Sequence, residues 1–445
     1  MRNDSGRPQL EERSPGWRSP RAFAWAALAL AAGYLLVWGV WRGLTTSFDL
    51  TVGFAAGQAW FQGRDPYDVM VLEEILGASS GGVDTGNRLD ALRNVYLPAT
   101  LPLFVPFGVV SWPVARVAML GLNVAAAVFI AVGLGRSLGW RPTEPRALLL
   151  AAFVLALAPL HTSMAIGQSA VLATALLVAG LLLQRSGRAA AAGVAYGLAM
   201  AVKIQIGLPF VAYQWWRRRW ITAGSATAVL ALLGVVAILR MAAAGVPWLS
   251  TWSANLALLS GPGGINDASP FNDDRYSLVN LQYLLHSLGS DRSSAEVITL
   301  AVVAAIALVA LLLLFRVRDE RRDLLAFAVI APLSLLVVYH RFYDAVLLAF
   351  PIAWAVSRWE AGERRLAGAM LLLSADFLLP AQTGLHDLQQ RQILPLALTD
   401  NPVWTSILMT QHVWALVLMV PVLLWHATRM DRQTRQKPSA APLIP

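Results

Sequence analysis

Apolar segments close to 20 residues long recur along the chain, and each is long enough to cross ~30 Å of hydrocarbon. Short clusters of arginine separate them, and loops rich in Arg and Lys lie on the cytoplasmic side of membrane proteins. With every cluster on that side, the apolar segments must cross in pairs. The pattern predicts an all-α polytopic membrane protein with about twelve transmembrane helices. They are expected over residues 22–41, 113–135, 147–162, 169–184, 189–202, 204–216, 220–244, 295–315, 323–339, 342–357, 366–380 and 404–426.

Three outer loops follow from this topology, over residues 42–112, 245–295 and 381–403. The first carries most of the acidic residues of the N-terminal half and a short, Pro-rich apolar run at 97–110, which we expect to be re-entrant or interfacial. The transmembrane domain is predicted to span 22–426, between polar cytoplasmic tails at 1–21, expected to be disordered, and 427–445. Because no small-residue cleavage site follows 22–41, that segment is expected to be a retained anchor.

Composition agrees with a membrane protein and excludes several functions. Only 14% of the residues are charged and 57% are hydrophobic, whereas soluble proteins carry about 25% charged residues. The net charge of +9 comes from basic residues scattered between apolar runs, so nucleic-acid binding is not indicated. The chain has no cysteine, which excludes disulfides and thiolate chemistry. No His/Asp cluster has metal-ligand spacing, so we expect no cofactor and no obligatory divalent metal.

The segment YHRFYD, residues 339–344, places His340, Arg341 and Asp344 inside an otherwise apolar stretch. Ionisable residues at membrane depth are costly and usually mark a functional path. The paired topology puts this segment at the outer turn between two helices. A simple turn requires Gly, Asn or Pro rather than three charged groups, so these side chains are predicted to be functional.

Four more polar residues fall on the same face of the membrane, and each also has a structural interpretation. Asp49 follows the first span and is suited to cap the next helix. Lys203 interrupts AVKIQIGLP and is able to extend its ammonium to lipid headgroups. His161 is suited to fill the membrane interface, and Gln168 to hydrogen bond between helices.

Together these residue types suit one chemistry. Arg and Lys form charge-assisted hydrogen bonds to phosphate oxygens, so a cationic cluster at the outer interface suits a lipid-linked phosphate. A separate carboxylate suits a general base that takes a proton from an incoming hydroxyl. The combination predicts glycosyl transfer from a polyprenyl-phosphate sugar.

Five segments in order resemble a known family. FDLTVGFAAGQAWFQGRDPYDV (48–69) resembles the first outer loop of the polyprenol-phosphate-mannose-dependent glycosyltransferases of the GT-C class, in particular glycosyltransferase family 87. That loop has an Asp after the first span, an amphipathic helix and Gly-x-x-Pro-Tyr, here GRDPY at 63–67. The resemblance continues in NVYLPATLPLFVPF, AIGQSAVLATALLVAGLLL, RAAAAGVAYGLAMAVKIQIGLPF and YHRFYDAVLLAFP. It covers most of residues 20–360.

The resemblance implies a GT-C fold whose large first outer loop carries interfacial helices. It implies that Asp49 is the catalytic base, that His340 stands at the donor phosphate or sugar, and that Lys203 and Arg341 bind the phosphate. Further site candidates are Asp344, Gln168, Tyr67, Tyr343 and His161. The reaction would invert the anomeric centre and move a sugar, by family default mannose, to a lipid or glycan acceptor at the outer face of a bacterial plasma membrane.

Two other functions use similar residues. A transporter or flippase for a polar lipid would also escort a phosphate with basic side chains, but a long acidic outer loop and the absence of duplicated halves argue against it. A polymerase or ligase of surface polysaccharide would also handle lipid-linked sugars, with its chemistry centred on the loop 245–295.

Overall fold

The computed structural model describes residues 20–79, 92–317, 322–399 and 401–436, and the side chains up to residue 430. Within these ranges the chain is helical, with one isolated β-bridge and no strand. The predicted fold class, an all-α polytopic membrane protein, is confirmed. Nearly all of the predicted N-terminal tail and the last part of the C-terminal tail lie outside the described residues.

Five described helices are long and apolar enough to cross a membrane. They are α1 (Pro20–Leu35) with the π-helix η1 (Leu36–Trp41), α5 (Trp112–Ser137), α11 (Trp220–Ala243), α14 (Arg292–Arg316) and α20 (Gln411–Gln436). Two bent pairs bring the number to seven if each pair is one span. These are α6 (Pro145–Leu155) with α7 (Ala158–Ile166), bent by 52°, and α17 (Arg364–Ala375) and η6 (Asp376–Leu378) with α18 (Ala381–Gln390), bent by 41°.

The other predicted spans contain shorter helices. They are α8 (Ala170–Arg185), α9 (Ala189–Val202), α10 (Ile204–Trp216), α15 (Arg322–Leu335) and α16 (Ala349–Glu360). At 1.5 Å per residue even α8 covers only about 24 Å, less than the ~30 Å hydrocarbon core. Every predicted span therefore contains a helix, while the count of twelve crossings stays a prediction.

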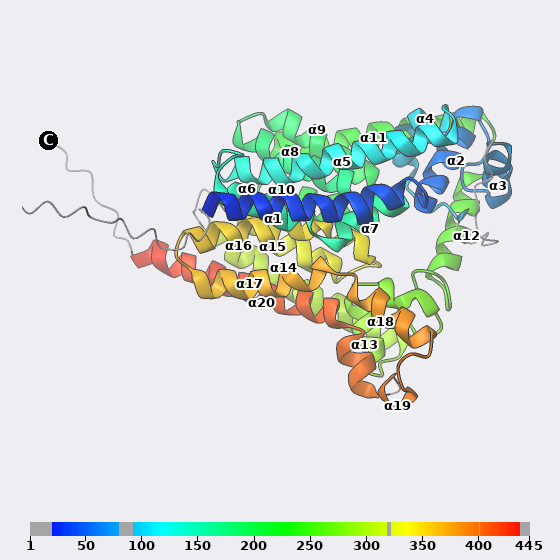
Figure 1. The fold of residues 1–445 in the computed structure, drawn as a ribbon. Helices are drawn as coiled ribbons and strands as arrows, with labels where there is room; N and C mark the ends of the chain where they lie inside the picture. Colours follow the sequence, from blue (N-terminus) through cyan, green and yellow to red (C-terminus); the bar gives the residue numbers. More distant parts are fainter. Residues whose placement is uncertain (1–19, 80–91, 318–321, 400, 437–445) are drawn as a thin grey trace, which may run out of the picture.

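The helices form a bundle in which α9 packs between α8 and α11, α1 packs on α6, and α15 packs on α20 (Figure 1). One continuous apolar core runs through the bundle and includes Tyr196, Phe210, Phe327 and Phe350. The aromatic rings of Phe210 and Phe327 meet edge to face with their centroids 4.8 Å apart, an arrangement that aromatic pairs favour.

The first outer loop folds into α2 (Phe48–Gln62), α3 (Val69–Ala78), the 3-10 helix η3 (Pro98–Thr100) and α4 (Leu101–Gly108). Of these, α2, α3 and α4 share a second core with the ends of α5 and α11, built on Phe54, Leu72 and Met241 among others. A Cβ at Gly108 would lie 2.5 Å from the backbone nitrogen of Gln58, so glycine permits this close packing of α4 on α2. The run 97–110 thus contains the short helices η3 and α4, while its expected re-entrant or interfacial position stays a prediction.

The segments of the two other predicted outer loops lie at the same end of the bundle (Figure 1). They are α12 (Trp248–Ser260), η4 (Asp273–Ser277), α13 (Leu281–Ser287), α19 (Leu396–Thr399) and the π-helix η7 (Trp404–Leu408). All three predicted loops are therefore grouped at one end, opposite the C-terminal end of α20.

The predicted span 323–339 is wrong in its last turn. Helix α15 ends at Leu335, and the chain then passes through a turn and a bend at residues 336–338 before Arg341 and the 3-10 helix η5 (Phe342–Leu348). Backbone hydrogen bonds to the second outer loop replace those of the helix: Val279 N donates to His340 O at 2.9 Å, and Arg341 forms a β-bridge with Leu278. The second outer loop thereby fixes the backbone of YHRFYD.

Candidate active site

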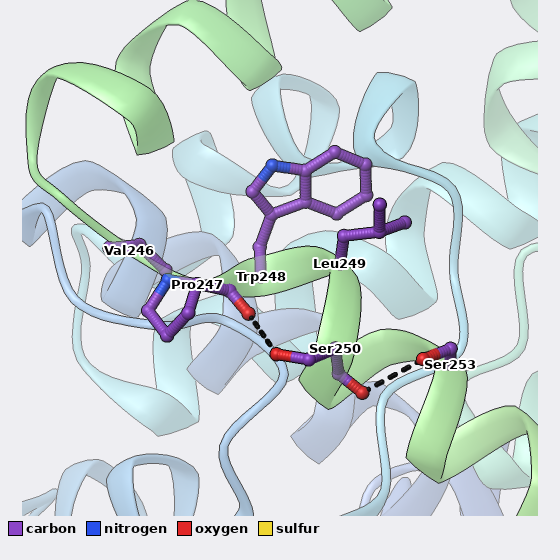
Figure 2. Close-up of a pocket in the computed structure, with 6 residues that line it drawn as sticks. All are labelled: Val246, Pro247, Trp248, Leu249, Ser250 and Ser253. Atoms are coloured by element: carbon purple, nitrogen blue, oxygen red, sulfur yellow. Dashed lines mark hydrogen bonds between the residues drawn. The ribbon is translucent and has the colours of Figure 1, made fainter.

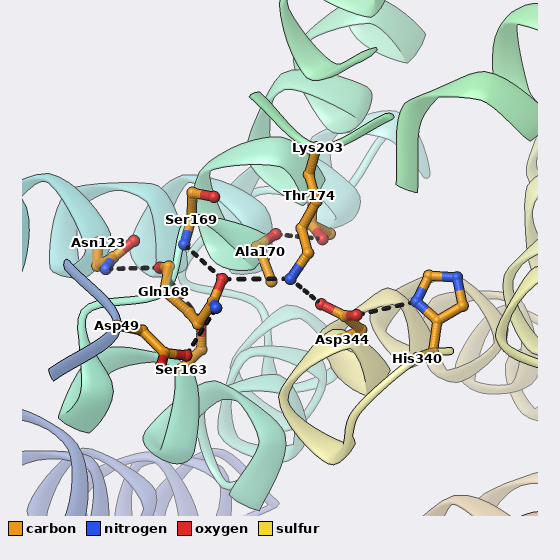
Figure 3. Close-up of polar contacts among 10 residues, drawn as sticks. All are labelled: Asp49, Asn123, Ser163, Gln168, Ser169, Ala170, Thr174, Lys203, His340 and Asp344. Atoms are coloured by element: carbon orange, nitrogen blue, oxygen red, sulfur yellow. Dashed lines mark hydrogen bonds and ion pairs between the residues drawn. The ribbon is translucent and has the colours of Figure 1, made fainter. Parts of the chain in front are cut away.

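A chain of polar contacts joins four separate parts of the sequence (Figure 3). Gln168 Nε2 donates to Asp49 Oδ2 at 2.7 Å, and Gln168 Oε1 accepts from Lys203 Nζ at 3.2 Å. Lys203 Nζ lies 2.6 Å from Asp344 Oδ1, and Asp344 Oδ2 lies 2.9 Å from His340 Nδ1. Five of the predicted site residues therefore form one connected cluster, which we call the Asp49–His340 chain.

Asp49 lies in the first turn of α2, beyond the span that ends at Trp41. The cap position belongs to Ser47, and the Asp49 carboxylate bonds to Gln168 instead of to the helix end, so the capping interpretation is wrong. Burial raises the pKa of the Asp49 carboxyl, and this effect exceeds the opposing effects of the Gln168 hydrogen bond and the charges of Arg341 and Lys203. A carboxylate with a raised pKa is a stronger base.

Gln168 lies in the turn between α7 and α8, directly after Gly167. Gly167 has a φ of 75°, and a Cβ there would lie 2.8 Å from the Cβ of Leu50. Because glycine adopts this conformation without steric cost and leaves the space open, the turn reaches the start of α2. The backbone carbonyl of Gln168 also accepts from Asn123 Nδ2 at 3.1 Å, so a third helix fixes this turn.

Lys203 lies at the break between α9 and α10, with extended dihedrals of φ −156° and ψ 96°. A Cβ at Gly207 would lie 2.4 Å from the nitrogen of Met200, which shows how closely α10 folds back on α9. The Lys203 side chain is only 4% exposed, and its ammonium lies 4.5 Å from the centre of the Tyr343 ring. The interpretation that Lys203 extends to lipid headgroups is therefore wrong.

Asp344 links Lys203 to His340 in the Asp49–His340 chain, because its two oxygens bind different partners. One oxygen pairs with Lys203 and the other with His340 Nδ1, and all three side chains are buried. The second ring nitrogen of His340, Nε2, has no hydrogen-bond partner among the described residues. Asp344 thus fixes the orientation of the imidazole and leaves Nε2 for another group.

The Arg341 side chain is not hydrogen bonded to the residues of the Asp49–His340 chain. Its guanidinium donates to Ser277 Oγ at 2.9 Å and to the carbonyl of Ile265, both in the second outer loop. Its charge still acts on Asp49. Among the described residues no carboxylate lies within salt-bridge distance of Arg341, so its charge is not neutralised by a direct partner there.

His161 and Tyr67 lie apart from the Asp49–His340 chain. His161 Nε2 lies 2.7 Å from Leu155 O, and its ring packs on Tyr34 with centroids 4.2 Å apart. Tyr67 is fully buried and donates from its hydroxyl to Tyr96 O at 3.1 Å. Both contacts serve packing and loop shape, while the position of His161 at the membrane interface stays a prediction.

The acidic residues beside Tyr67 shape the loop. Asp65 accepts from Tyr67 N at 2.9 Å, and Asp68 accepts from Met70 N at 2.9 Å as the N-cap of α3. Both carboxylates accept from the backbone, and Asp65 Oδ2 also accepts from Thr251 Oγ1 at 2.9 Å. The carboxylate of Asp49 instead faces the polar cluster.

Sequence reasoning missed two residues beside the cluster. The phenol of Tyr96 interacts with the Gln168 side chain and lies in the field of Asp49 and Asp344. Asn123 is fully buried within α5. A single Asn inside an apolar span was the available signal for Asn123, and Tyr96 lies in the segment NVYLPATL that carries part of the family resemblance.

Two other features of the described residues do not indicate a catalytic site. A hollow of about 450 Å³ lies along α12 (Figure 2), but its lining contains no ionisable side chain, and the hydroxyls of Ser250 and Ser253 donate to backbone carbonyls. Among the described residues no group of three or more His, Asp or Glu side chains could hold a metal ion. The expectation of a metal-independent reaction stays a prediction.

Comparison with known families decides the class of the protein. The model of glycosyltransferase family 87 matches residues 94–339, more than half of the chain. The chain belongs to glycosyltransferase family 87. This family 87 glycosyltransferase carries Gln168 and Lys203 within the matched region, while Asp49 precedes it and His340 follows its last residue. No curated protein and no solved structure matches the chain significantly.

The buried pair of Lys203 and Asp344 gives a prediction on stability. Lys203→Met leaves the Asp344 carboxylate buried with His340 as its remaining partner, and removing one member of a buried pair typically costs about 3–5 kcal/mol. Lys203→Met/Asp344→Leu removes both charges and should recover much of that loss. Thermal unfolding of the two variants in detergent measures the difference. A Lys203→Met protein that unfolds at the wild-type temperature would contradict the pairing.

Proposed function

We propose that the protein is an inverting hexosyltransferase that moves a sugar from a polyprenyl-phosphate donor to a lipid or glycan acceptor. Mannose is the proposed sugar, and the product is α-linked. The proposed site faces the outer side of a bacterial plasma membrane. The observation that supports this proposal is the position of the Asp49 carboxylate, held by Gln168 at one end of a cluster whose other members are Lys203, Asp344 and His340.

Asp49 acts in this proposal as the general base. Gln168 binds Oδ2, and the other oxygen, Oδ1, accepts no hydrogen bond from any side chain or backbone group in the described ranges. Oδ1 takes the proton of the acceptor hydroxyl while that oxygen attacks the anomeric carbon and the bond from this carbon to the phosphate oxygen breaks. One displacement inverts the centre and requires one carboxylate rather than two.

The leaving polyprenyl phosphate departs as an anion, so its stabilisation takes the place of a general acid. His340 contributes Nε2, which donates to a phosphate oxygen when the imidazole is protonated, and Asp344 stabilises that positive charge. Arg341 contributes a guanidinium bound to the neutral oxygens of Ser277 and Ile265. Lys203 is already paired with Asp344, so Arg341 is the stronger candidate for direct phosphate binding.

The alternatives have weaker support. A transporter or flippase would not be expected in a glycosyltransferase family. A polymerase or ligase centred on 245–295 would be expected to place ionisable groups of that loop at the site, whereas the contacts from the loop to YHRFYD come from Ser277 and backbone atoms.

The role of Asp49 is tested by Asp49→Asn. The substitution keeps the size of the side chain but removes the proton acceptor, and general base catalysis is typically worth 10²–10⁴-fold. Turnover of radiolabelled polyprenyl-phosphate mannose with a lipid extract should fall at least ~100-fold in kcat while the donor KM changes little. Asp65→Asn is the matched control, because Asp65 binds backbone and should remain active. An active Asp49→Asn enzyme would contradict the assignment of the base.

The proposed orientation is tested by cysteine labelling in a chain that has no cysteine of its own. Ser253 in α12 and Ser186 in the turn between α8 and α9 are both exposed, so their access to solvent is matched. Ser253→Cys should react with an impermeant thiol reagent in intact cells, and Ser186→Cys should react only after the membrane is opened. The reverse pattern would place the Asp49–His340 chain on the cytoplasmic side.

A further inference from the structure

The Gln168 side chain lies between two charged groups of opposite sign. Its amide nitrogen is 2.7 Å from the carboxylate of Asp49, and its amide oxygen is 3.2 Å from the ammonium of Lys203. Asn and Gln amides have two orientations that differ only in the exchange of N and O. Here the chemistry selects one, because the exchanged orientation would set the oxygen against the carboxylate and the NH₂ group against the ammonium.

The backbone of Gln168 is fixed independently of its side chain. Gly167 supplies the left-handed turn, Gln168 N donates to Ser163 O at 2.8 Å, and Asn123 binds the carbonyl. Gln168 is buried, with only 6% of the residue exposed. A buried amide with a fixed backbone and two charged partners has one favourable conformation, and its NH₂ group therefore presents a fixed donor to Asp49.

Lys203 does not bind Asp49 directly. Its closest carboxylate is Asp344, at 2.6 Å, and Gln168 separates its ammonium from Asp49. A direct ion pair would hold a proton acceptor in its ionised form too strongly for it to act as a base. A neutral amide between the two groups orients the carboxylate with a weaker interaction.

We propose that Gln168 is a positioning residue for the catalytic base: its amide, oriented by Lys203, holds the Asp49 carboxylate in one conformation and keeps it separate from the ammonium. This role rests on the proposed function of Asp49 in glycosyl transfer. Gln168 itself touches neither reacting atom. Besides the neutral amide of Gln168, the ionisable groups that act on or feel the charge of Asp49 are Tyr96, Lys203, Arg341, Tyr343 and Asp344.

Gln168→Glu tests the proposal with the smallest change. It keeps the length of the side chain and the acceptor for Lys203, but it replaces the donor to Asp49 with a carboxylate oxygen. Loss of the donor and addition of a like charge both favour protonated Asp49. The acidic limb of the profile of kcat/KM against pH should therefore move to higher pH by about one unit or more, with activity partly recovered at alkaline pH.

Gln214→Glu is the matched control. Gln214 is also a fully buried amide, on α10, and its Oε1 accepts from Arg219 Nη1 at 3.0 Å. The change to Glu keeps that acceptor. The protein therefore gains the same charge at a position that is remote from Asp49 in sequence and does not contact it. Its pH profile should match that of the wild type.

A second readout does not depend on transfer activity. A hydrophobic carbodiimide modifies protonated carboxyl groups, and labelling of Asp49, quantified by mass spectrometry with Asp49→Asn as the blank, reports its protonation as the pH is raised. Labelling should persist to higher pH in Gln168→Glu than in the wild type and in Gln214→Glu.

The outcomes are distinct. A kcat lowered equally at every pH, with unchanged carbodiimide labelling, would overturn the positioning role and leave Gln168 a structural residue. A shift in labelling without any transfer activity in the wild type would support the contact between Gln168 and Asp49 but contradict the proposed function. If Gln168→Glu fails to fold, Gln168→Met removes the donor without adding charge, and an unshifted labelling curve for it would also overturn the proposal.

Discussion

The ammonium of Lys203 and the carboxylate of Asp344 lie 2.6 Å apart inside the protein, where neither is more than 4% exposed. Each charge would be costly without the other, because desolvation in the interior is compensated only by close pairing and further hydrogen bonds. The pair joins the break between α9 and α10 to the start of η5. His340 binds the second oxygen of Asp344, and Gln168 accepts a hydrogen bond from the ammonium of Lys203, so the site is assembled around this single interaction.

The polar residues of the site share a structural feature, which is that each lies at the start, end or interruption of a helix. Asp49 begins α2, Gln168 separates α7 from α8, Lys203 separates α9 from α10, and His340 precedes η5. Non-helical backbone at membrane depth is tolerated where the protein buries it and satisfies its hydrogen bonds. Here the second outer loop does so for YHRFYD, and Asn123 does so for the turn at Gln168. The helices of the bundle are therefore short where the chain brings these polar side chains, the proposed site residues, together.

Periodicity and charge were sufficient to predict the helical class and the interruption at Lys203, since these depend on local sequence. They were not sufficient to predict partners. Lys203 and Asp344 are 141 positions apart, and Gln168 and Asp49 are 119 apart. Which of two polar residues meet across a bundle depends on how short helices tilt and rotate against each other, and apolar runs carry little information on rotation. The same limit explains why Arg341 was grouped with its neighbours although it points to Ser277, and why Tyr96 was overlooked.

The central claim is that the Asp49–His340 chain is the place where a lipid-linked sugar is held and transferred. The most direct measurement is an electron cryo-microscopy structure of the Asp49→Asn protein with a polyprenyl-phosphate sugar bound. The account predicts the phosphate within hydrogen-bond distance of His340 Nε2 or the Arg341 guanidinium, and the anomeric carbon on the side facing residue 49. A headgroup bound elsewhere, with the cluster of Lys203, Asp344 and His340 unchanged and out of contact, would contradict it.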